Sequence, residues 1–325
     1  MKFLIIQTAF IGDVILMTPI ISELKRIYPD SAIDVVVRKG NEVLLTNNPK
    51  INKIIIWNKR QQKYKSLLKT ISQIRQKEYD EIITLQRYAN AGFMTMFGKA
   101  KKKIGFDKNK FSWVYDIKIR HSLTSGKHEV ERNLELIQHH NCKKLIRPEL
   151  FPSKDDFEFV KQFQSETYFC VAPSSVVPSK QLPAEKWLEL FEILSKKGQI
   201  LLIGAHNDYD LCESLKEKFP QQIQNLAGKT SLLQSAALMK DAAMNFTNDS
   251  SPLHIASSMN APVRAFFTGT IPLYGFGPLS DDSKVIEPNP KLNQSLTTPT
   301  GIKSPIDGLY NMGSKIEISP ENLSI

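Results

Sequence analysis

Short apolar runs of strand length alternate along this chain with longer segments whose apolar residues recur every three or four positions. The apolar runs are Phe3–Gln7, Ile33–Val37, Ile54–Trp57, Glu81–Leu85, Tyr168–Ala172, Gln199–Gly204, Ala242–Thr247 and Val263–Phe267. The segments with helical spacing are Thr18–Tyr28, Gln62–Lys77, Ala184–Lys196, Asp208–Lys218 and Ser231–Lys240. Strands that alternate with helices in this way predict an α/β fold built on parallel sheets.

The pattern is interrupted between Leu145 and Pro152, where two prolines and several polar residues lie. Because single domains rarely grow beyond ~250–300 residues, a chain of 325 residues can bury two cores. We therefore expect two doubly wound, Rossmann-like domains at residues 1–150 and 151–325, with ligands at the carboxyl ends of the strands and in the cleft between the domains. The tail after Glu287 has no strong periodicity and is expected to be irregular.

Positive charge is concentrated in the first half of the chain. Residues 1–150 contain 28 basic and 14 acidic residues, a net charge of +14, whereas the remainder has 15 basic and 19 acidic residues. This excess of positive charge indicates an acidic partner, which could be nucleic acid, anionic lipid or a phosphorylated glycan. The alternative is that it only forms a solvated surface. No aromatic residues interleave with a basic patch, which argues against nucleic acid. The densest basic group consists of Lys99, Lys101, Lys102, Lys103, Lys108 and Lys110.

Several common kinds of site are not supported by the sequence. The cysteines Cys142, Cys170 and Cys212 lie far apart, so neither a disulfide framework nor a zinc site is expected. No G-x-G-x-x-G follows the first strand, and GFMTMFGKA does not match a Walker loop. No apolar run reaches the ~18 residues of a membrane span. The apolar start is interpreted as a buried strand and not as a signal peptide, which predicts a cytoplasmic protein.

The loop after the first strand carries Gly12 and Asp13. Gly12 is expected to permit a tight turn and the close approach of a ligand. Asp13 has two interpretations: it is the N-cap of the following helix, or it is a carboxylate general base that takes a proton from a hydroxyl group.

A second polar segment, TNDSSPLHIASS, begins at Thr247 and lies where a strand is expected to turn into a helix. Asp249 or Ser250 can cap that helix, and Pro252 is tolerated in its first turn. The first backbone N–H groups of a helix have no partner within it and attract anions such as a diphosphate. An ordinary capped helix explains the same residues, so both interpretations stand at this point.

Several segments in sequence order together resemble the ADP-heptose:lipopolysaccharide heptosyltransferases of glycosyltransferase family nine. The resemblance covers most of the chain, from Phe3 to about Ser280. The segments are FLIIQTAFIGDVILMTPIISELKRIYPDSAIDVVV, EYDEIITLQ, KKKIGF, HEVERNLEL, LAGKTSL, TNDSSPLHIASSMNAPVRAFF and GFGPLS. The resemblance implies the two-domain GT-B fold and an inverting transfer of a sugar from a nucleotide diphosphate to an acceptor hydroxyl, with no metal and no cofactor.

The resemblance also implies roles for individual residues. Asp13 matches the family's catalytic aspartate, and Lys180, in KQLP where the family has K-x-W-P, matches a group that stabilises the leaving diphosphate. Without the family context, Lys180 is an ordinary solvated loop lysine, Asp208 is a helix N-cap and His254 is a packed helix histidine. The expected donor-binding residues are Ser175, Asp208, Lys229, Thr230, Asp249, Ser250, Ser251 and His254.

The first domain is expected to bind the acceptor, which for the family is an acidic lipopolysaccharide core, with Gly12, Lys101, Lys102 and Lys103 on the acceptor side. The positive charge would also favour peripheral association with the anionic inner-membrane surface. Further departures from the family pattern are Ser251, which replaces a usual glycine, and FFTGT, ending at Thr270, which replaces F-G-P-T. The remaining alternatives are another donor, such as an ADP- or UDP-hexose, and a non-catalytic protein that binds an anionic glycan or other polyanion.

Overall fold

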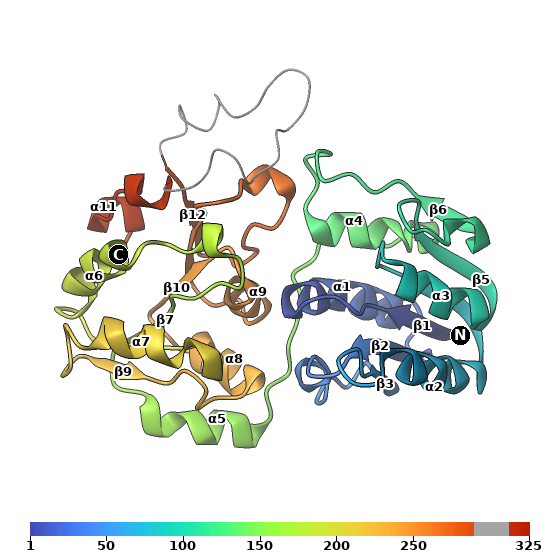
Figure 1. Cartoon of the computed structure of the whole chain (residues 1–325), viewed down its shortest axis with the longest axis horizontal. Helices are drawn as coiled ribbons and strands as arrows, with labels where there is room; N and C mark the ends of the chain where they lie inside the picture. Colours follow the sequence, from blue (N-terminus) through green and yellow to red (C-terminus); the bar gives the residue numbers. More distant parts are fainter. Residues whose placement is uncertain (289–311) are drawn as a thin grey trace. The chain divides into compact units, whose positions relative to one another are not determined.

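The computed structural model describes residues 1–288 and 312–325, which form two compact units, Met1–Phe151 and Pro152–Ile325. Most of the tail that was expected to be irregular, residues 289–311, lies outside the described residues. Within the described ranges, each unit contains a six-stranded parallel sheet with helices on both faces (Figure 1).

The sheet of the first unit has the strand order β3-β2-β1-β4-β5-β6. In register, Ile6 of β1 lies beside Val36 of β2 and Thr84 of β4, so these three strands end at one edge. Strand β2 is buried from Ile33 to Val37 without alternation, as expected for a parallel strand covered on both faces. The strands are β1 (Lys2–Ile6), β2 (Ala32–Arg38), β3 (Lys53–Trp57), β4 (Glu78–Thr84), β5 (Lys99–Phe106) and β6 (Ile117–Ile119).

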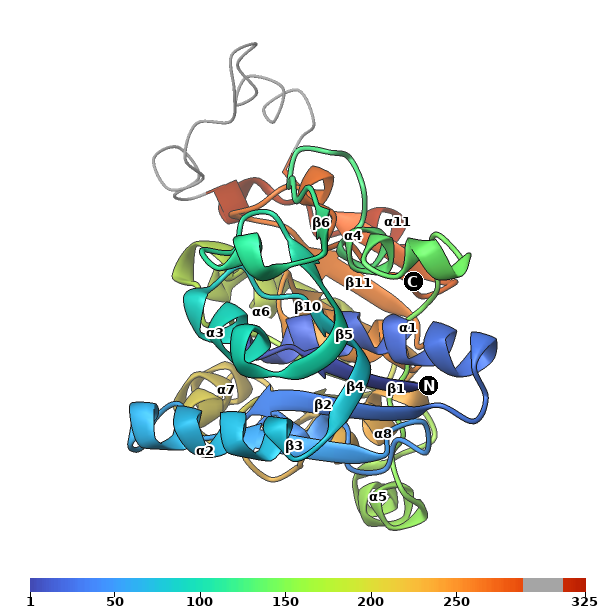
Figure 2. The ribbon, with the colours of Figure 1, turned by 90° about the vertical axis from the view of Figure 1, so that its right-hand side faces the viewer.

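Helices α1 (Ile11–Ile27) and α4 (Glu129–Glu135) pack together on one face of this sheet, and α2 (Lys63–Arg75) and α3 (Ala89–Phe97) pack together on the other (Figure 2). Helix α2 presents Leu67, Ile71 and Ile74 to the sheet, the spacing of a helix with one buried face. The helix predicted to begin at Thr18 is longer than expected, since α1 begins at Ile11. Short 3₁₀ turns are η1 (Glu42–Leu44), η2 (Ser112–Val114) and η3 (Gln138–His140).

The sheet of the second unit has the order β12-β11-β10-β7-β8-β9. Taken from its other edge, this order repeats the first unit, because the unit's first strand, β7, lies beside its fourth, β10. This is the doubly wound topology in which ligands bind where the strand order reverses. The strands are β7 (Tyr168–Ala172), β8 (Gln199–Leu202), β9 (Ile223–Asn225), β10 (Met244–Asn248), β11 (Val263–Phe266) and β12 (Ser283–Ile286).

Helix α6 (Ala184–Leu194) buries Trp187, Leu190 and Phe191 in the main core of this unit, together with α7 (Tyr209–Lys216) and the C-terminal α11 (Pro320–Leu323). A separate group, α5 (Lys154–Val160), α8 (Leu232–Lys240) and α9 (Ser251–Ser258), packs together. No helix within residues 1–288 and 312–325 combines the length and apolar character needed to cross a membrane. The 3₁₀ turns are η4 (Lys161–Phe163), η5 (Pro178–Lys180), η6 (His206–Asp208), η7 (Pro272–Tyr274) and η8 (Met312–Lys315).

Candidate active site

The loop between β1 and α1 is held in place by side-chain amides. The Oε1 atom of Gln7 accepts a hydrogen bond from Nε2 of Gln86 at 2.5 Å and from the N–H of Ala9 at 3.3 Å. Asn41 donates its amide to the carbonyl of Ala9 at 2.9 Å. These hydrogen bonds tie the loop that precedes Asp13 to Asn41 and Gln86.

Asp13 is the third residue of α1, and the N-cap is Phe10. The Oδ2 atom of Asp13 accepts the N–H of Phe10 at 3.1 Å, which satisfies one of the free donors at the helix start. The interpretation of Asp13 as the N-cap is therefore wrong, although its carboxylate does support the helix start. The tight turn predicted at Gly12 is also wrong, because Gly12 is the second residue of α1 and is not among the glycines with positive φ.

The environment of Asp13 opposes its negative charge. Burial raises the pKa of Asp13 to about 6, and the nearby carboxylate of Glu129 acts in the same direction. The N–H groups of Phe10 and Asp13 and the cation of Arg38, which lies over the Phe10 ring at 4.8 Å, only partly offset this. A carboxyl group that titrates near neutral pH is suited to accept a proton during a reaction.

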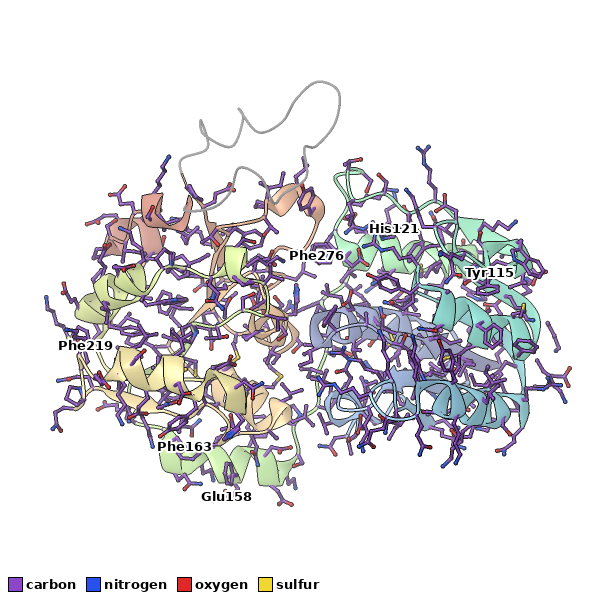
Figure 3. The ribbon with its side chains drawn as sticks, in the orientation of Figure 1. Tyr115, His121, Glu158, Phe163, Phe219 and Phe276 are labelled. Atoms are coloured by element: carbon purple, nitrogen blue, oxygen red, sulfur yellow. The ribbon has the colours of Figure 1, made fainter. Side chains whose placement is uncertain are left out.

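Glu129, the first residue of α4, is fixed in its charged form beside α1. The Nε and Nη2 atoms of Arg132 both approach its Oε2 atom at 2.7 Å. His121, which is labelled in Figure 3, lies 3.8 Å from the same oxygen. Burial opposes the charge, but His121 and Arg132 together hold the pKa of Glu129 below its ordinary value. Asn133 donates to a carbonyl of α1 at 3.2 Å and so ties the two helices together.

The three lysines expected on the acceptor side are the third to fifth residues of β5. Lys101 pairs with Asp80 at 2.7 Å, and Lys103 donates to a carbonyl of α3 at 2.9 Å. The side chain of Lys102 is exposed. In register, Lys102 and Lys103 are level with Phe3 and Leu4 of β1, before the end of that strand. The structure does not bring the three lysines to Asp13, and their acceptor role stays a prediction.

In the second unit, Lys180 follows β7 and Asp249 follows β10, the two strands at the reversal of strand order. The Nζ atom of Lys180 lies 2.6 Å from Oδ2 of Asp249, and the hydroxyl of Thr270 donates to the same oxygen. Asp249 is buried, so its charge needs these two donors. Two residues that the sequence singled out in separate segments are therefore brought together.

The loop that carries Lys180 is clamped onto the end of β10 and the segment after β11. The side chain of Asn248 accepts the N–H of Leu182 at 2.9 Å and donates to the carbonyl of Pro173 at 2.8 Å. A Cβ atom at Gly269 would lie 2.2 Å from the carbonyl oxygen of Ser179, so only glycine fits there. Sequence reasoning missed Asn248 and the Thr270 contact, although their polar side chains next to strand ends were a usable signal.

The start of α9 agrees with part of the prediction. Ser250 is the N-cap and Pro252 lies in the first turn, but the Ser250 hydroxyl points to the carbonyl of Asn248 at 3.5 Å and does not cap the helix. Ser251 is the first helical residue, and His254 is a buried residue of the same helix. A helix start that lacks a side-chain cap is suited to receive an anion from solution.

Asp208 holds two loops together at the carboxyl ends of β7 and β8. Its Oδ1 atom accepts the hydroxyl of Ser174 at 2.6 Å, and its Oδ2 atom accepts the N–H of Ala205 at 2.7 Å. It precedes α7 but does not cap it with its side chain. Gly204 must be glycine, because an added Cβ would lie 2.9 Å from the Asp208 side chain. The hydroxyl of Ser175 accepts the N–H of Val177 at 3.4 Å.

Lys229 and Thr230 belong to the turn between β9 and α8. Lys229 donates to the carbonyl of Asn225 at 2.9 Å, and the Thr230 hydroxyl lies 2.8 Å from that of Ser235. Both side chains are therefore bonded within their own turn. Their expected contact with a nucleotide stays a prediction.

Comparison with known proteins identifies the family to which the chain belongs. Residues 67–298 match the family described as glycosyltransferase family 9 (heptosyltransferase). The chain is similar to lipopolysaccharide heptosyltransferase 3 of Escherichia coli (28% identity; 80% of each chain) and to lipooligosaccharide heptosyltransferase 2 of Haemophilus influenzae (25% identity; 88% of each chain). Its fold is similar to that of the E. coli ADP-heptose lps heptosyltransferase II, with a TM-score of 0.78, 23% identity and coverage of 97% and 96% of the two chains.

The predicted fold class, two doubly wound Rossmann-like domains of the GT-B type, is confirmed by these structural matches. The match to the family extends over well more than half of the chain and includes β5, α4, Lys180, Asp249 and α9. The chain therefore belongs to glycosyltransferase family 9 and is a glycosyltransferase of the heptosyltransferase type.

Proposed function

We propose that this enzyme moves heptose from ADP-heptose to a hydroxyl group of the lipopolysaccharide inner core, with inversion at the anomeric carbon and without a metal ion. The similar proteins are lipopolysaccharide and lipooligosaccharide heptosyltransferases, and one is named an ADP-heptose heptosyltransferase. The observation that carries the proposal is chemical: one unit holds a carboxyl group with a raised pKa, and the other holds a lysine beside an uncapped helix start.

In the proposed reaction, Asp13 takes the proton of the acceptor hydroxyl while the hydroxyl oxygen attacks the anomeric carbon. The bond from that carbon to the diphosphate oxygen breaks, and the bonding electrons leave with ADP. A single displacement inverts the configuration. The environment of Asp13 favours this proton transfer, because a raised pKa makes the carboxylate a stronger base.

The leaving ADP gains negative charge, which must be stabilised as the bond breaks. The cation of Lys180 and the N–H groups at the start of α9 supply positive charge to the diphosphate, with the hydroxyls of Ser250 and Ser251 as further donors. These groups would take the place of a divalent metal. The expected contacts to the rest of the nucleotide sugar involve Ser175, Asp208, Lys229, Thr230 and His254.

The acceptor would be recognised in the first unit through its acidic groups. Arg38 lies at the carboxyl end of β2, and its charge is felt at Asp13. A guanidinium binds carboxylate and phosphate groups in a defined geometry. Arg38 is therefore the cation that we expect to contact the acidic core sugar or phosphate next to the reacting hydroxyl.

Helix α2 is the surface that we propose for peripheral association with an anionic membrane. Residues 43–77 contain nine Lys and Arg and no Asp or Glu. On α2, Tyr64 is 74% exposed and Leu68 is 62% exposed, one helical turn apart. An aromatic ring and an aliphatic side chain among cations suit the interface of a negatively charged bilayer.

The central test is a transfer assay with ADP-heptose and Kdo-lipid A acceptors, read by mass spectrometry, with the anomeric configuration assigned by NMR. We expect a product one heptose heavier than the acceptor, and we expect turnover to survive EDTA. Asp13→Asn should abolish turnover, whereas Asp30→Asn, an exposed carboxylate just after the same helix, should not. Transfer from a different nucleotide sugar would change the donor assignment, and no transfer from any donor would overturn the proposal.

Membrane association is tested by co-sedimentation with vesicles of phosphatidylcholine alone or with added phosphatidylglycerol. We expect binding only to the anionic vesicles, and a weaker interaction at high salt. Tyr64→Ser together with Leu68→Ser should reduce binding further. Equal binding to both kinds of vesicle would contradict the role of the positive charge.

A further inference from the structure

A cluster of side chains of the kinds that bind metals lies in the first unit, away from Asp13. Glu81 of β4 meets two consecutive histidines, His139 and His140, of the turn η3. The Nε2 atom of His139 lies 3.0 Å from Oε1 of Glu81, and that of His140 lies 2.9 Å from Oε2. Among residues 1–288 and 312–325, this is the one group of three such residues whose ligand atoms all lie within 4.8 Å of one another.

The distances suit a small tetrahedral cation. Zinc is bound by imidazole nitrogen and carboxylate oxygen at ~2.0–2.2 Å, which places neighbouring ligand atoms roughly 3.3 Å apart. The Nε2 atoms of His139 and His140 face different oxygens of Glu81, at 3.0 and 2.9 Å, and the ligand atoms all lie within 4.8 Å of one another, so the carboxylate must turn one oxygen toward both rings for the three side chains to share an ion. Two nitrogens and one oxygen form a ligand set that zinc accepts.

Burial leaves one side of the cluster open. The side chain of Glu81 is 3% exposed and that of His140 is 7% exposed, whereas that of His139 is 27% exposed. An ion can therefore enter beside His139, and a water molecule can complete a tetrahedron from the same side. The buried carboxylate supplies negative charge in a region where two imidazoles are its partners.

The hydroxyl of Tyr28 provides an outer partner for one ligand. It lies 3.0 Å from Nδ1 of His140, on the ring nitrogen that does not face Glu81. A tyrosine hydroxyl can donate or accept, so it suits both tautomers of the ring. When Nε2 binds a cation, an Nδ1–H of the same ring can donate to Tyr28. Metal-binding histidines commonly have such an outer partner.

From these contacts we propose that Glu81, His139 and His140 bind one Zn²⁺ ion, with a water molecule as fourth ligand and Tyr28 as the outer partner of His140. The proposal does not depend on the transferase chemistry proposed above.

The position of this site indicates a structural role. Tyr28 follows the end of α1, whereas Asp13 lies in its first turn, and the helix rise of 1.5 Å per residue separates them by roughly 22 Å. The ion would fasten the segment after α4 to strand β4. It would thus brace the packing of α4 on α1, the contact that keeps Glu129 near Asp13.

The first test is a calorimetric titration of the EDTA-treated, full-length protein with ZnCl₂. We expect one ion per chain for the natural protein and loss of this event in His139→Ala, whose side chain is the most exposed of the three. His139→Gln is the second variant, in case the alanine variant is unstable. His206→Asn removes an exposed imidazole of the second unit and should bind zinc as the natural protein does.

A second test uses the outer partner and the geometry. Tyr28→Phe keeps the ring but removes the hydroxyl, and we expect zinc affinity to fall by about 10–100-fold. Co²⁺ in place of Zn²⁺ should give the intense visible absorption of a four-coordinate ion in the natural protein and not in His139→Ala. Zinc should also raise the unfolding temperature of the natural protein only.

The proposal is overturned if the natural protein binds no stoichiometric zinc, or if His139→Ala and His139→Gln bind it as tightly as the natural protein does. In that case, the three residues form a hydrogen-bonded group that holds protons and no metal.

Discussion

The two units present polar side chains at the same point of the same sheet topology, but their local charges differ. In the first unit, Asp13 follows the central strand β1 and lies near a second carboxylate, that of Glu129. In the second, Lys180 follows the corresponding strand β7, and its cation is paired with Asp249. Burial and the Glu129 carboxylate raise the pKa of Asp13, whereas Asp249 accepts hydrogen bonds from Lys180 and Thr270.

The contrast shows that the topology fixes where a functional side chain lies, while the neighbouring elements decide its charge. Both positions are at the carboxyl ends of the central strands, where doubly wound sheets bind ligands. In the first unit, burial is the largest cause and the Glu129 carboxylate of α4 adds to it; in the second, the partners of Asp249 come from η5 and from the segment after β11. Each prediction below changes one side of this comparison.

The largest expected effect is that of Asp13→Asn on the rate of transfer. Loss of a general base costs about 10²–10⁴-fold, and asparagine keeps the size of the side chain. Because Asp13 belongs to the first unit and the proposed donor contacts to the second, kcat should fall while the dissociation constant for ADP, measured by calorimetry, stays unchanged. An equal loss of ADP affinity would show that Asp13 acts in donor binding.

The next effect is that of Lys180→Gln. We expect kcat/KM to fall by about 10²–10³-fold, since a positive charge opposite the leaving group is lost. Asp249 also loses a charged donor at 2.6 Å, so ADP affinity and stability should both fall. The exposed Lys196→Gln is the matched control.

A double variant, Lys180→Gln with Asp249→Asn, separates structure from catalysis at this pair. Removing both charges should restore part of the stability but none of the activity. Recovery of activity in the double variant would mean that Lys180 serves only as a partner for Asp249.

Much of the fold could be predicted from the sequence, because central parallel strands are mostly apolar runs, as Phe3 to Ile6 of β1 illustrate. The start of α1 was missed because its residues are buried on every side from Val14 to Ile21, which removes the helical period. Strand β5 was also missed, since its first half is a run of lysines whose strand character comes only from pairing with β4.

The candidate site could be predicted only in part. Asp13, Lys180 and Asp249 stand in local motifs next to strand ends, and a resemblance in sequence could find them. The effect of Glu129 on Asp13 arises from the packing of helices more than a hundred positions apart in the sequence. The zinc site proposed at Glu81 was not expected either, because the spacing of its ligands matches no local pattern.

Replacing Asp13 and replacing Asp249 by asparagine should change the free energy of unfolding in opposite directions. Because the pKa of Asp13 is raised to about 6 in the folded protein, the folded state holds a proton that the unfolded state has lost. Stability from this group falls as pH rises from about 4 to 6. At pH 7.5, Asp13→Asn should therefore stabilise the protein, by about 1–3 kcal/mol.

Asp249→Asn should instead destabilise the protein, by about 1.5–3 kcal/mol, because charged hydrogen bonds from Lys180 and Thr270 are weakened. Urea unfolding at pH 7.5 and pH 4.5 gives the free energy of unfolding of both variants. The gain from Asp13→Asn should shrink at the lower pH. If both variants changed the free energy of unfolding in the same direction at pH 7.5, the proposed difference between the two carboxylates would be wrong.

The smallest expected effect tests the neighbour that sets the charge of Asp13. Glu129→Gln removes a negative charge that opposes ionisation of Asp13, so the pKa of Asp13 should fall. The acidic limb of the plot of kcat/KM against pH should therefore shift to lower pH by roughly half to one unit. Glu135→Gln, at the other end of α4, loses only its pair with Lys127 and should leave the limb in place. If Glu129→Gln only destabilised the protein, kcat/KM would fall at every pH and the acidic limb would stay at the same pH. An acidic limb that stays in place would show that Glu129 does not contribute to the raised pKa of Asp13.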